Sequence, residues 1–169
     1  SVAAYDSVSF SVSSQDSVPQ GIFVSTDGTK LYIVGTTSDT VYQYSLSTAN
    51  DLSTASYDSV SFSVSSQETV PADLFFKPDG TRMYILGRTG DDVTQYVVDT
   101  AWDYSTISSN NRESISAQEP TPYAFFFKPD GTAMYVTGAI DEVFEYSLGT
   151  PWNVQSSSYV GTVEPAGFI

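Results

Sequence analysis

An internal repeat is the feature that most constrains the fold. The segment from Tyr5 to Gln15 reads Tyr-Asp-Ser-Val-Ser-Phe-Ser-Val-Ser-Ser-Gln, and the segment from Tyr57 to Gln67 has the same sequence. An Asp-Gly-Thr triplet at 27–29 likewise returns at 79–81 and, in a third copy, at 130–132. Units of this kind bury their apolar faces against their neighbours, because one unit alone is too small to enclose a core. The sequence therefore predicts a row of about three equivalent units, each of about 52 residues.

Each repeat contains four short segments with the character of β-strands. The first is an apolar run, as expected for a strand that is covered on both faces. The second follows the Asp-Gly-Thr turn, in which glycine supplies a left-handed backbone conformation. The fourth alternates serine with valine and phenylalanine, which is typical of a half-buried strand. The first strand is predicted at 21–24, 74–76 and 125–127, and the second at 30–34, 82–86 and 133–136. The third is predicted at 41–46, 93–98 and 143–148, and the fourth at 7–13, 59–65 and the diverged 111–117.

Four antiparallel strands in a unit of about 50 residues describe one blade of a β-propeller. A β-sandwich needs no such repeat, and a β-solenoid coil is usually shorter and has no hairpin in each unit. We therefore expect an all-β fold, a portion of a β-propeller with about three four-stranded antiparallel blades. The blades are expected at 16–66, 67–117 and 118–164, with 1–15 as the outer strand of a neighbouring blade and 165–169 as the start of a next blade.

The repeat also resembles a known type. The second copy carries Phe76-Lys77-Pro78-Asp79-Gly80-Thr81 followed by Tyr84, Gly87, Asp92, Val93 and Tyr96. This pattern resembles the β-propeller repeats of the Tyr-Val-Thr-Asn and surface-antigen type, and the longer unit is similar to repeats of marine phage and bacterial surface or tail-fibre proteins. The resemblance covers nearly the whole chain. It implies the blade, and it extends to lactonase-like enzymes, whose catalytic residues have no counterpart that we identify in this sequence.

Three blades do not close a ring, because propellers use about four to eight. Apolar blade faces and strand edges at both ends then need partners. We expect these partners to be other copies of this chain or the remaining blades of a longer one. Residues 5–14 are predicted to be the assembly strand, which pairs outside its own three blades by β-augmentation and buries Val8, Phe10 and Val12.

Composition excludes several functions. The chain has 169 residues, with 20 acidic and 6 basic residues and a net charge of −14. This charge argues against nucleic acid as a partner, because a polyanion is repelled. No apolar run is long enough to insert into a membrane as a helix. With no His and no Cys, imidazole and thiolate chemistry are excluded, and no cofactor is expected apart from calcium as a candidate cation.

Acidic residues recur at two places in the repeat, and both are expected on one face of the propeller. The first set lies at the entry to the inner strand and the second between the second and third strands. We favour repeated turn acids that aid solubility. The alternative is a site for a cation or a polyhydroxylated ligand at the mouth of the axial channel. The two sets are Asp16, Glu68 and Glu119, and Asp39, Asp92 and Glu142.

Two tryptophans occupy one position of the repeat. Trp102 and Trp152 lie in the loop before the fourth strand, and Asn50 takes their place in the first copy. An exposed indole there would stack on a sugar ring, as in propeller lectins. We favour the alternative that each indole covers the apolar edge of a blade.

These observations predict a non-enzymatic structural or recognition protein. The expected location is extracellular, on a cell surface or in a virion, with glycans or a cell surface as further candidate partners. The repetition, the acidity and the lack of catalytic side chains support this function. A lectin-like carbohydrate-binding propeller is the first alternative, and a lactonase-like or glycosidase-like enzyme is the second.

Overall fold

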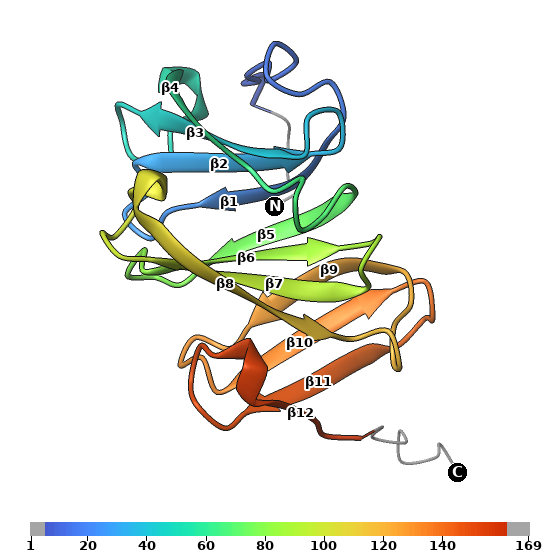
Figure 1. Ribbon diagram of the computed structural model, residues 1–169. Coiled ribbons are helices and arrows are strands. Elements are labelled where there is room, and N and C mark those ends of the chain that lie inside the picture. The colour runs from blue at the N-terminus through green and yellow to red at the C-terminus, as the bar shows by residue number, and fades with distance from the viewer. Residues whose placement is uncertain (1–5, 162–169) are drawn as a thin grey trace.

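The computed structural model describes residues 6–161, and it places three four-stranded antiparallel sheets one after another along the chain (Figure 1). In each sheet the strands follow one another in chain order, so each sheet is one blade of a propeller. The prediction of an all-β fold with about three blades is confirmed. Blade 1 holds β1 (Pro19–Val24), β2 (Lys30–Gly35), β3 (Thr40–Leu46) and β4 (Ala55–Ser63); blade 2 holds β5 (Pro71–Phe76), β6 (Arg82–Gly87), β7 (Asp92–Val98) and β8 (Ile107–Ser114); blade 3 holds β9 (Pro122–Phe127), β10 (Ala133–Gly138), β11 (Val143–Leu148) and β12 (Ser157–Tyr159).

The Asp-Gly-Thr turns form the hairpins that join the first and second strands. In blade 2, Gly80 has a φ of +72° and Asp79 Oδ1 accepts hydrogen bonds from the Thr81 N–H and hydroxyl. The aspartate side chain therefore stabilises the turn by hydrogen bonds, and the glycine adopts its left-handed backbone conformation. The same geometry returns in blades 1 and 3, as the repeat predicts.

The outer strands begin earlier than the sequence predicted. Strands β4 and β8 start at Ala55 and Ile107, because a short 3₁₀ turn leads directly into each of them. The carboxylate of Asp51 or Asp103 accepts a hydrogen bond from the backbone two residues later and so starts that turn. Asn153 does the same before β12. The alternating Ser-Val-Phe pattern therefore marks only the second half of each outer strand.

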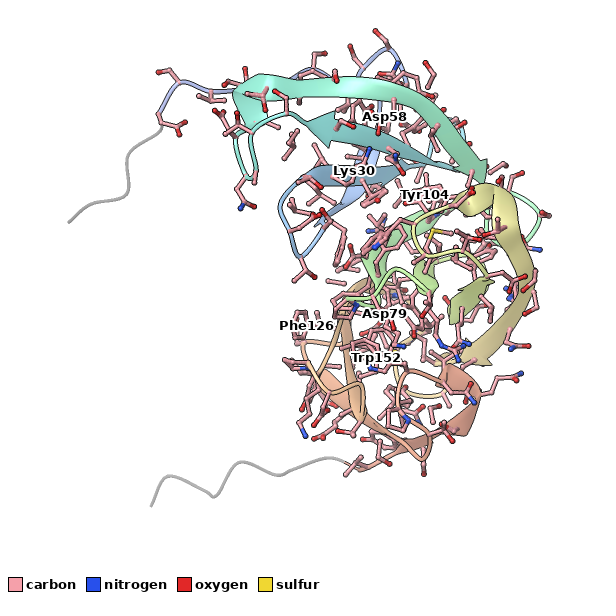
Figure 2. The ribbon with its side chains drawn as sticks, turned by 90° about the vertical axis from the view of Figure 1, so that its left-hand side faces the viewer. Lys30, Asp58, Asp79, Tyr104, Phe126 and Trp152 are labelled. Carbon is pink, nitrogen blue, oxygen red and sulfur yellow. The ribbon has the colours of Figure 1, made fainter. Side chains whose placement is uncertain are left out.

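Aromatic side chains fill the seams between neighbouring blades. Blades 1 and 2 share a core that contains Tyr32, Phe76 and Tyr96, all buried. Blades 2 and 3 share a second core, in which Tyr84 and Phe127 have ring centroids 4.4 Å apart. Figure 2 shows the three sheets following one another along an arc. The repeat thus folds because each blade covers the apolar face of the next one.

Residues 8–13 occupy the place of an outer strand in front of blade 1. Phe10 packs edge-to-face on Tyr44 at 5.5 Å, just as Phe62 of β4 packs on Tyr96 at 5.3 Å. The segment itself is not assigned to a strand. Its assignment to a neighbouring blade stays a prediction, and the predicted start of a next blade at 165–169 lies outside the described residues.

The two end faces of the arc carry exposed apolar side chains. On blade 1, Ile22 is 65% exposed, and on blade 3, Phe126 and Val143 are 54% and 70% exposed. These positions correspond to side chains that neighbouring blades cover elsewhere in the chain. Within residues 6–161, no helix has the length and apolar character needed to cross a membrane.

Candidate functional site

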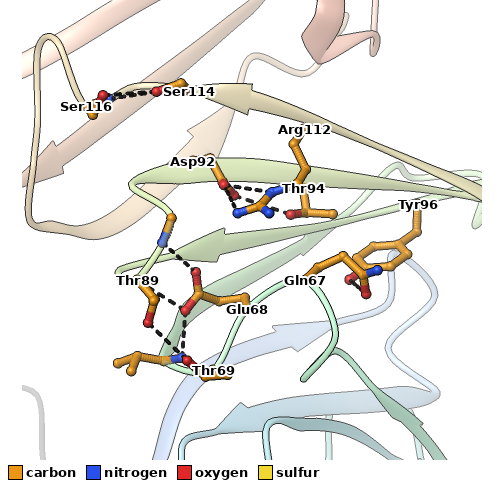
Figure 3. A network of polar contacts seen from close by, with 12 residues as sticks. Gln67, Glu68, Thr69, Thr89, Asp92, Thr94, Tyr96, Arg112, Ser114 and Ser116 are labelled. Atoms are coloured by element: carbon orange, nitrogen blue, oxygen red, sulfur yellow. Dashed lines mark hydrogen bonds and ion pairs between the residues drawn. The ribbon is translucent and has the colours of Figure 1, made fainter.

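The first predicted set of acids lies buried at the entry to the inner strands. Asp16, Glu68 and Glu119 are 1%, 2% and 0% exposed. Each carboxylate bridges its own loop and the loop between the second and third strands of the same blade. Glu68, for example, accepts hydrogen bonds from the Val70, Thr89 and Gly90 N–H groups at 2.6, 3.2 and 3.1 Å (Figure 3). This arrangement ties two loops of a blade together through backbone donors.

The hydrogen bonds to Asp16 lower the pKa of its carboxyl. Burial alone raises the pKa of this carboxyl, but the N–H groups of Val18 and Ser38 and the Ser38 hydroxyl outweigh burial and hold the pKa below its ordinary value. No group of three acidic side chains suited to a metal ion occurs in the part of the chain that the structure describes. A cation site at these acids, with calcium as its ion, stays a prediction, and the geometry gives the three acids a structural role.

The second predicted set was aligned wrongly by one residue. Asp39, Asp91 and Asp141 are the true equivalents, since each has a left-handed backbone with a φ of 48°, 46° and 42°. Asp92 and Glu142 lie one position further on and correspond to Thr40. The three predicted acids therefore do not form one ring. The 52-residue spacing of the Asp-Gly-Thr triplets at 27–29 and 79–81 also relates Asp39 to Asp91, so the sequence alone supports the corrected alignment.

Asp92 has a partner of its own. It is buried, and Arg112 of the neighbouring strand β8 pairs with it, with Nε 2.8 Å from Oδ2 (Figure 3). Burial raises the pKa of the Asp92 carboxyl, although Arg112 opposes that effect. Glu142 is exposed. The second set thus divides into a left-handed turn residue, a buried ion pair and a solvent-exposed acid.

The two tryptophans pack across the seams, as the favoured alternative predicts. Trp102 stacks on Tyr32 of blade 1 at 5.9 Å, and Trp152 stacks on Phe75 of blade 2 at 6.3 Å. Trp152 is 9% exposed, whereas Trp102 is half-buried and lines a pocket. The two equivalent indoles are therefore not equally accessible.

A second group of residues stands out because it departs from the repeat. Asp73 replaces the Gly21 and Ala124 of the other inner strands. Arg88 and Tyr123 likewise have no like residue at the matching positions of the other two blades. The three departures lie together at the boundary of blades 2 and 3. Asp73 Oδ2 accepts a hydrogen bond from the Phe125 N–H at 3.3 Å, and Arg88 donates to the Pro122 carbonyl at 3.2 Å.

We name Asp73, Arg88 and Tyr123 the axial cluster. Strands β5 and β9 are the first strands of their sheets, so each has an edge that no strand of its own sheet covers, and β5 contacts β9. Asp73 lies between these two strands, and the Arg88 guanidinium lies 4.8 Å from the centroid of the half-exposed Tyr123 ring. The cluster thus combines a carboxylate, a cation and an exposed phenol at the innermost strands.

Burial raises the pKa of the Asp73 carboxyl from 3.8 to about 6, although the Leu74 and Phe125 N–H groups partly stabilise its charged form. A carboxylate with such a pKa is ionised at neutral pH and is more basic than an ordinary aspartate. Sequence reasoning missed this residue because it searched for acids that recur. The signal that identifies it is the reverse, a polar residue where the other copies have glycine and alanine.

Comparison with known proteins supports the fold independently. The family model described as "Lactonase, 7-bladed beta-propeller" matches residues 5–143. No curated protein matches the chain. Among solved structures, a putative 6-phosphogluconolactonase from Bacteroides uniformis superposes with a TM-score of 0.61 at 15% identity, over 85% of this chain and 40% of that one.

Two further structures agree. The periplasmic gluconolactonase of Pseudomonas aeruginosa gives a TM-score of 0.55 at 18% identity, over 86% of this chain and 39% of that one. A functionally unknown protein from Desulfotomaculum acetoxidans gives a TM-score of 0.58 at 19% identity, over 86% of this chain and 41% of that one. The chain thus spans about two fifths of the length of these relatives.

The family match corrects the functional prediction. A non-enzymatic structural or recognition protein was expected because no His–Ser or thiol arrangement is present, and that expectation treated the lactonase as the last alternative. The match covers blades 1 and 2 and extends into blade 3 as far as Val143, the first residue of β11, and it names a lactonase family. Because the match extends from residue 5 to residue 143 and the three blades follow one another in propeller order, the chain belongs to the lactonase family of seven-bladed β-propellers.

Proposed function

We propose that this chain forms three blades of a lactonase-like enzyme, which hydrolyses the ring ester of a lactone at the axial cluster. The observation that carries the proposal is the convergence of Asp73, Arg88 and Tyr123, three departures from the repeat, on strand β9. In a repeat protein the recurring residues build the scaffold. A function that occurs once in the molecule needs residues that occur once.

Hydrolysis of a lactone needs a base for water, and Asp73 fits that role. The sequence contains no His and no Cys, so a carboxylate is the natural base near neutral pH. Asp73 has the raised pKa that general-base catalysis favours. In the proposed step Asp73 removes a proton from water while the water oxygen bonds to the lactone carbonyl carbon. The ring C–O bond of the tetrahedral intermediate then breaks, the ring oxygen takes the proton that Asp73 removed from water, and a hydroxy acid is released while Asp73 returns to its ionised form.

Arg88 supplies positive charge beside this carboxylate. Its guanidinium is oriented by the Pro122 carbonyl and the Tyr123 ring. The contacts of Asp73 and Arg88 on β9 are three residues apart, which is about 10 Å along a strand and is more than the width of a five- or six-membered ring. A guanidinium in this place stabilises the oxyanion of the intermediate or an acidic group of the substrate.

Sugar-acid lactones are the proposed substrates. Two similar structures are named as a putative 6-phosphogluconolactonase and a gluconolactonase. Both names refer to cyclic esters of a polyhydroxylated acid, and such a ring presents hydroxyl groups to a carboxylate and a guanidinium. The predicted location outside the cell or in a virion stays a prediction, and of the similar proteins named above one is described as periplasmic.

The experiment compares lactone hydrolysis by the full chain and its variants. Gluconolactone and its 6-phosphate are hydrolysed in a pH-stat, and the rate is measured above that of buffer alone. Asp73→Asn is expected to lower kcat by about a hundredfold, because it removes the base and keeps the shape. Arg88→Gln is expected to raise KM more for the phosphorylated lactone than for the other one.

Asp103→Asn is the matched control. Asn153 occupies the equivalent capping position in blade 3, so this carboxylate-to-amide change is tolerated by the fold. The control should keep the parental rate. The proposal fails if the parent shows no rate above buffer with any lactone tested, or if Asp73→Asn and Asp103→Asn have the same kcat.

A further inference from the structure

A pocket of about 390 Å³ opens at the seam between blades 1 and 2, at the end of the blades opposite to the loop that carries Arg88. Blade 2 contributes Pro78 and Trp102 to it. From blade 1 the hairpin between β1 and β2 contributes Ser25, Thr26, Asp27, Thr29 and Lys30. We name this the seam pocket. Its size is near the lower end for ligand sites and suits a single ring.

The pocket exists because blade 1 departs from the repeat at two positions. Blades 2 and 3 carry Lys-Pro before the Asp-Gly-Thr turn, at 77–78 and 128–129, whereas blade 1 carries Ser25-Thr26. The shorter side chains leave the Trp102 indole half-buried. At the next seam the hairpin of blade 2 carries the longer Lys-Pro pair, and the equivalent Trp152 is 9% exposed.

The same departure leaves a carboxylate oxygen without its usual partner. In blades 2 and 3 the turn aspartate pairs with the lysine two residues before it, Lys77 with Asp79 at 2.6 Å and Lys128 with Asp130 at 3.0 Å. In blade 1 a serine stands in the lysine position, and it donates to Asp27 Oδ1 at 2.6 Å. Asp27 Oδ2 has no partner recorded among residues 6–161 and is exposed at the pocket.

The seam itself is also less complete than its counterpart. Between blades 2 and 3, the Tyr84 hydroxyl donates to the Trp152 carbonyl at 2.7 Å, and Gln95 Oε1 accepts from the Val154 N–H at 3.0 Å. At the matching places of blade 1, the Tyr32 hydroxyl and Gln43 Oε1 are buried and have no hydrogen-bond partner within residues 6–161. The two hydrogen bonds that join blades 2 and 3 at these positions therefore do not recur at the seam that carries the pocket.

The charges at the pocket oppose a charged ligand of either sign. Lys30 donates to Ser45 Oγ at 2.7 Å and to Asp58 Oδ2 at 2.8 Å, so one of its three N–H groups is left for a ligand (Figure 2). Asp27 repels an anion and Lys30 repels a cation. An uncharged ligand that both donates and accepts hydrogen bonds satisfies both side chains.

We propose that the seam pocket binds an uncharged hydroxylated ring, a monosaccharide or a cyclic polyol. The ring stacks with its C–H face on the Trp102 indole, one hydroxyl donates to Asp27 Oδ2, and another accepts from Lys30 Nζ. Ser25, Thr26 and Thr29 supply further hydroxyl groups. The site is independent of the axial cluster, because it lies at the other end of the blades and uses none of its residues.

The two tryptophans make the test direct. Trp152→Phe leaves Trp102 as the single indole of the chain. This variant is titrated with glucose, galactose, N-acetylglucosamine and myo-inositol while its fluorescence is recorded. We expect at least one of these rings to give a saturable change. Tetramethylammonium and inorganic phosphate are titrated in parallel as probes for cationic and anionic ligands.

The second variant fills the pocket with the residues of blade 2. Ser25→Lys with Thr26→Pro recreates a turn that blades 2 and 3 already fold, so the fold is kept, and the new lysine pairs with Asp27. Combined with Trp152→Phe, it should weaken ring binding by about tenfold or more. Ser65→Lys adds the same charge at an exposed serine at the other end of the blades and should leave the affinity unchanged.

Three results would overturn the proposal. The first is the absence of a saturable response to all four rings in Trp152→Phe that keeps its β-sheet circular dichroism. The second is equal affinity in the pocket-filling variant and in Ser65→Lys. The third is tighter binding of tetramethylammonium or phosphate than of any ring. Asp73→Asn should retain ring binding, so a failure of the lactonase proposal and a failure of this one are told apart.

Discussion

At the scale of single residues, the burial of Asp73 makes the stability of the chain depend on pH. The pKa of this carboxyl is 3.8 in its ordinary state and about 6 in the folded chain. Below about pH 3 the carboxyl is protonated in both states, and burial carries no electrostatic penalty. As pH rises towards 6 the unfolded chain loses the proton first. The penalty is therefore fully present above about pH 6, and it is on the order of 2–3 kcal/mol.

The variant Asp73→Asn isolates this effect. The free energy of unfolding is measured with urea at pH 4.5 and pH 7.5 for the parent and the variant. The free energy of unfolding of the variant, relative to that of the parent, is expected to rise by about 2 kcal/mol from pH 4.5 to pH 7.5, because only the parent buries a charge at the higher pH. Other acids titrate equally in both proteins and cancel. A difference between the two proteins that is the same at both pH values would contradict the burial of a charged Asp73.

The axial cluster and the buried acids differ in how far the sequence could predict them. Repetition correctly grouped Asp16, Glu68 and Glu119, because they follow the same residues in each copy. It could not predict that their oxygens face backbone N–H groups, since these donors come from a loop about 20 residues further along the chain. Asp73 was hidden for another reason. Its pKa depends on a strand of the next blade, and the sequence around Asp73 does not predict its contact with Phe125 of that strand.

At the scale of elements, the hairpin between β5 and β6 depends on Gly80. A Cβ atom there would lie 2.4 Å from the Trp102 ring, and the φ of +72° is one that β-branched residues resist. Gly80→Val is therefore expected to lower the free energy of unfolding by at least about 2 kcal/mol. The measurement is urea denaturation followed by tryptophan fluorescence.

Gly149→Ala provides the matched control in another loop. A Cβ atom at Gly149 would have its nearest neighbour, the Ser156 carbonyl oxygen, at 3.5 Å, which is an ordinary contact. This variant should change the free energy of unfolding by less than about 0.5 kcal/mol. Equal urea midpoints of unfolding for the two glycine variants would contradict the packing of Trp102 over the hairpin.

The strands show where periodicity suffices and where it does not. The inner three strands of each blade were predicted within three residues at each end, and the first strands were predicted correctly at their ends because their apolar runs stop before the Asp-Gly-Thr turns. The outer strands were predicted too short at their start. Their first residues, such as Ala55 and Ser56, do not alternate between apolar and polar side chains. They pair with β3 because the turn capped by Asp51 places the chain beside that strand.

At the scale of the whole molecule, the two end faces are complementary by construction. Phe126 on blade 3 matches Phe75 on blade 2, which packs against Phe125, Phe127 and Trp152 of the next blade. Ile22 on blade 1 matches Leu74 on blade 2, which is 2% exposed in the seam with blade 1. The repeat thus predicts both surfaces.

We expect copies of this chain to associate head to tail through these faces. The free face of blade 3 then contacts the free face of blade 1 in the next copy, as blade 2 contacts blade 3 within one chain. Each large apolar side chain so buried stabilises the contact by about 1.5–3 kcal/mol. Such a contact is heterologous, because its two surfaces differ. Phe126→Glu and Ile22→Glu each block one surface and leave the other intact.

Sedimentation velocity over a range of concentrations measures the outcome. The parent should associate as concentration rises, and each variant alone should stay monomeric. A mixture of the two variants should form a dimer and stop there, because the dimer uses the one free surface of each copy and only the two blocked surfaces remain. Ser116→Glu, at an exposed serine between blades 2 and 3, should behave as the parent. A parent that is monomeric at all concentrations, or variants that associate as strongly as the parent, would show that the faces do not bind each other.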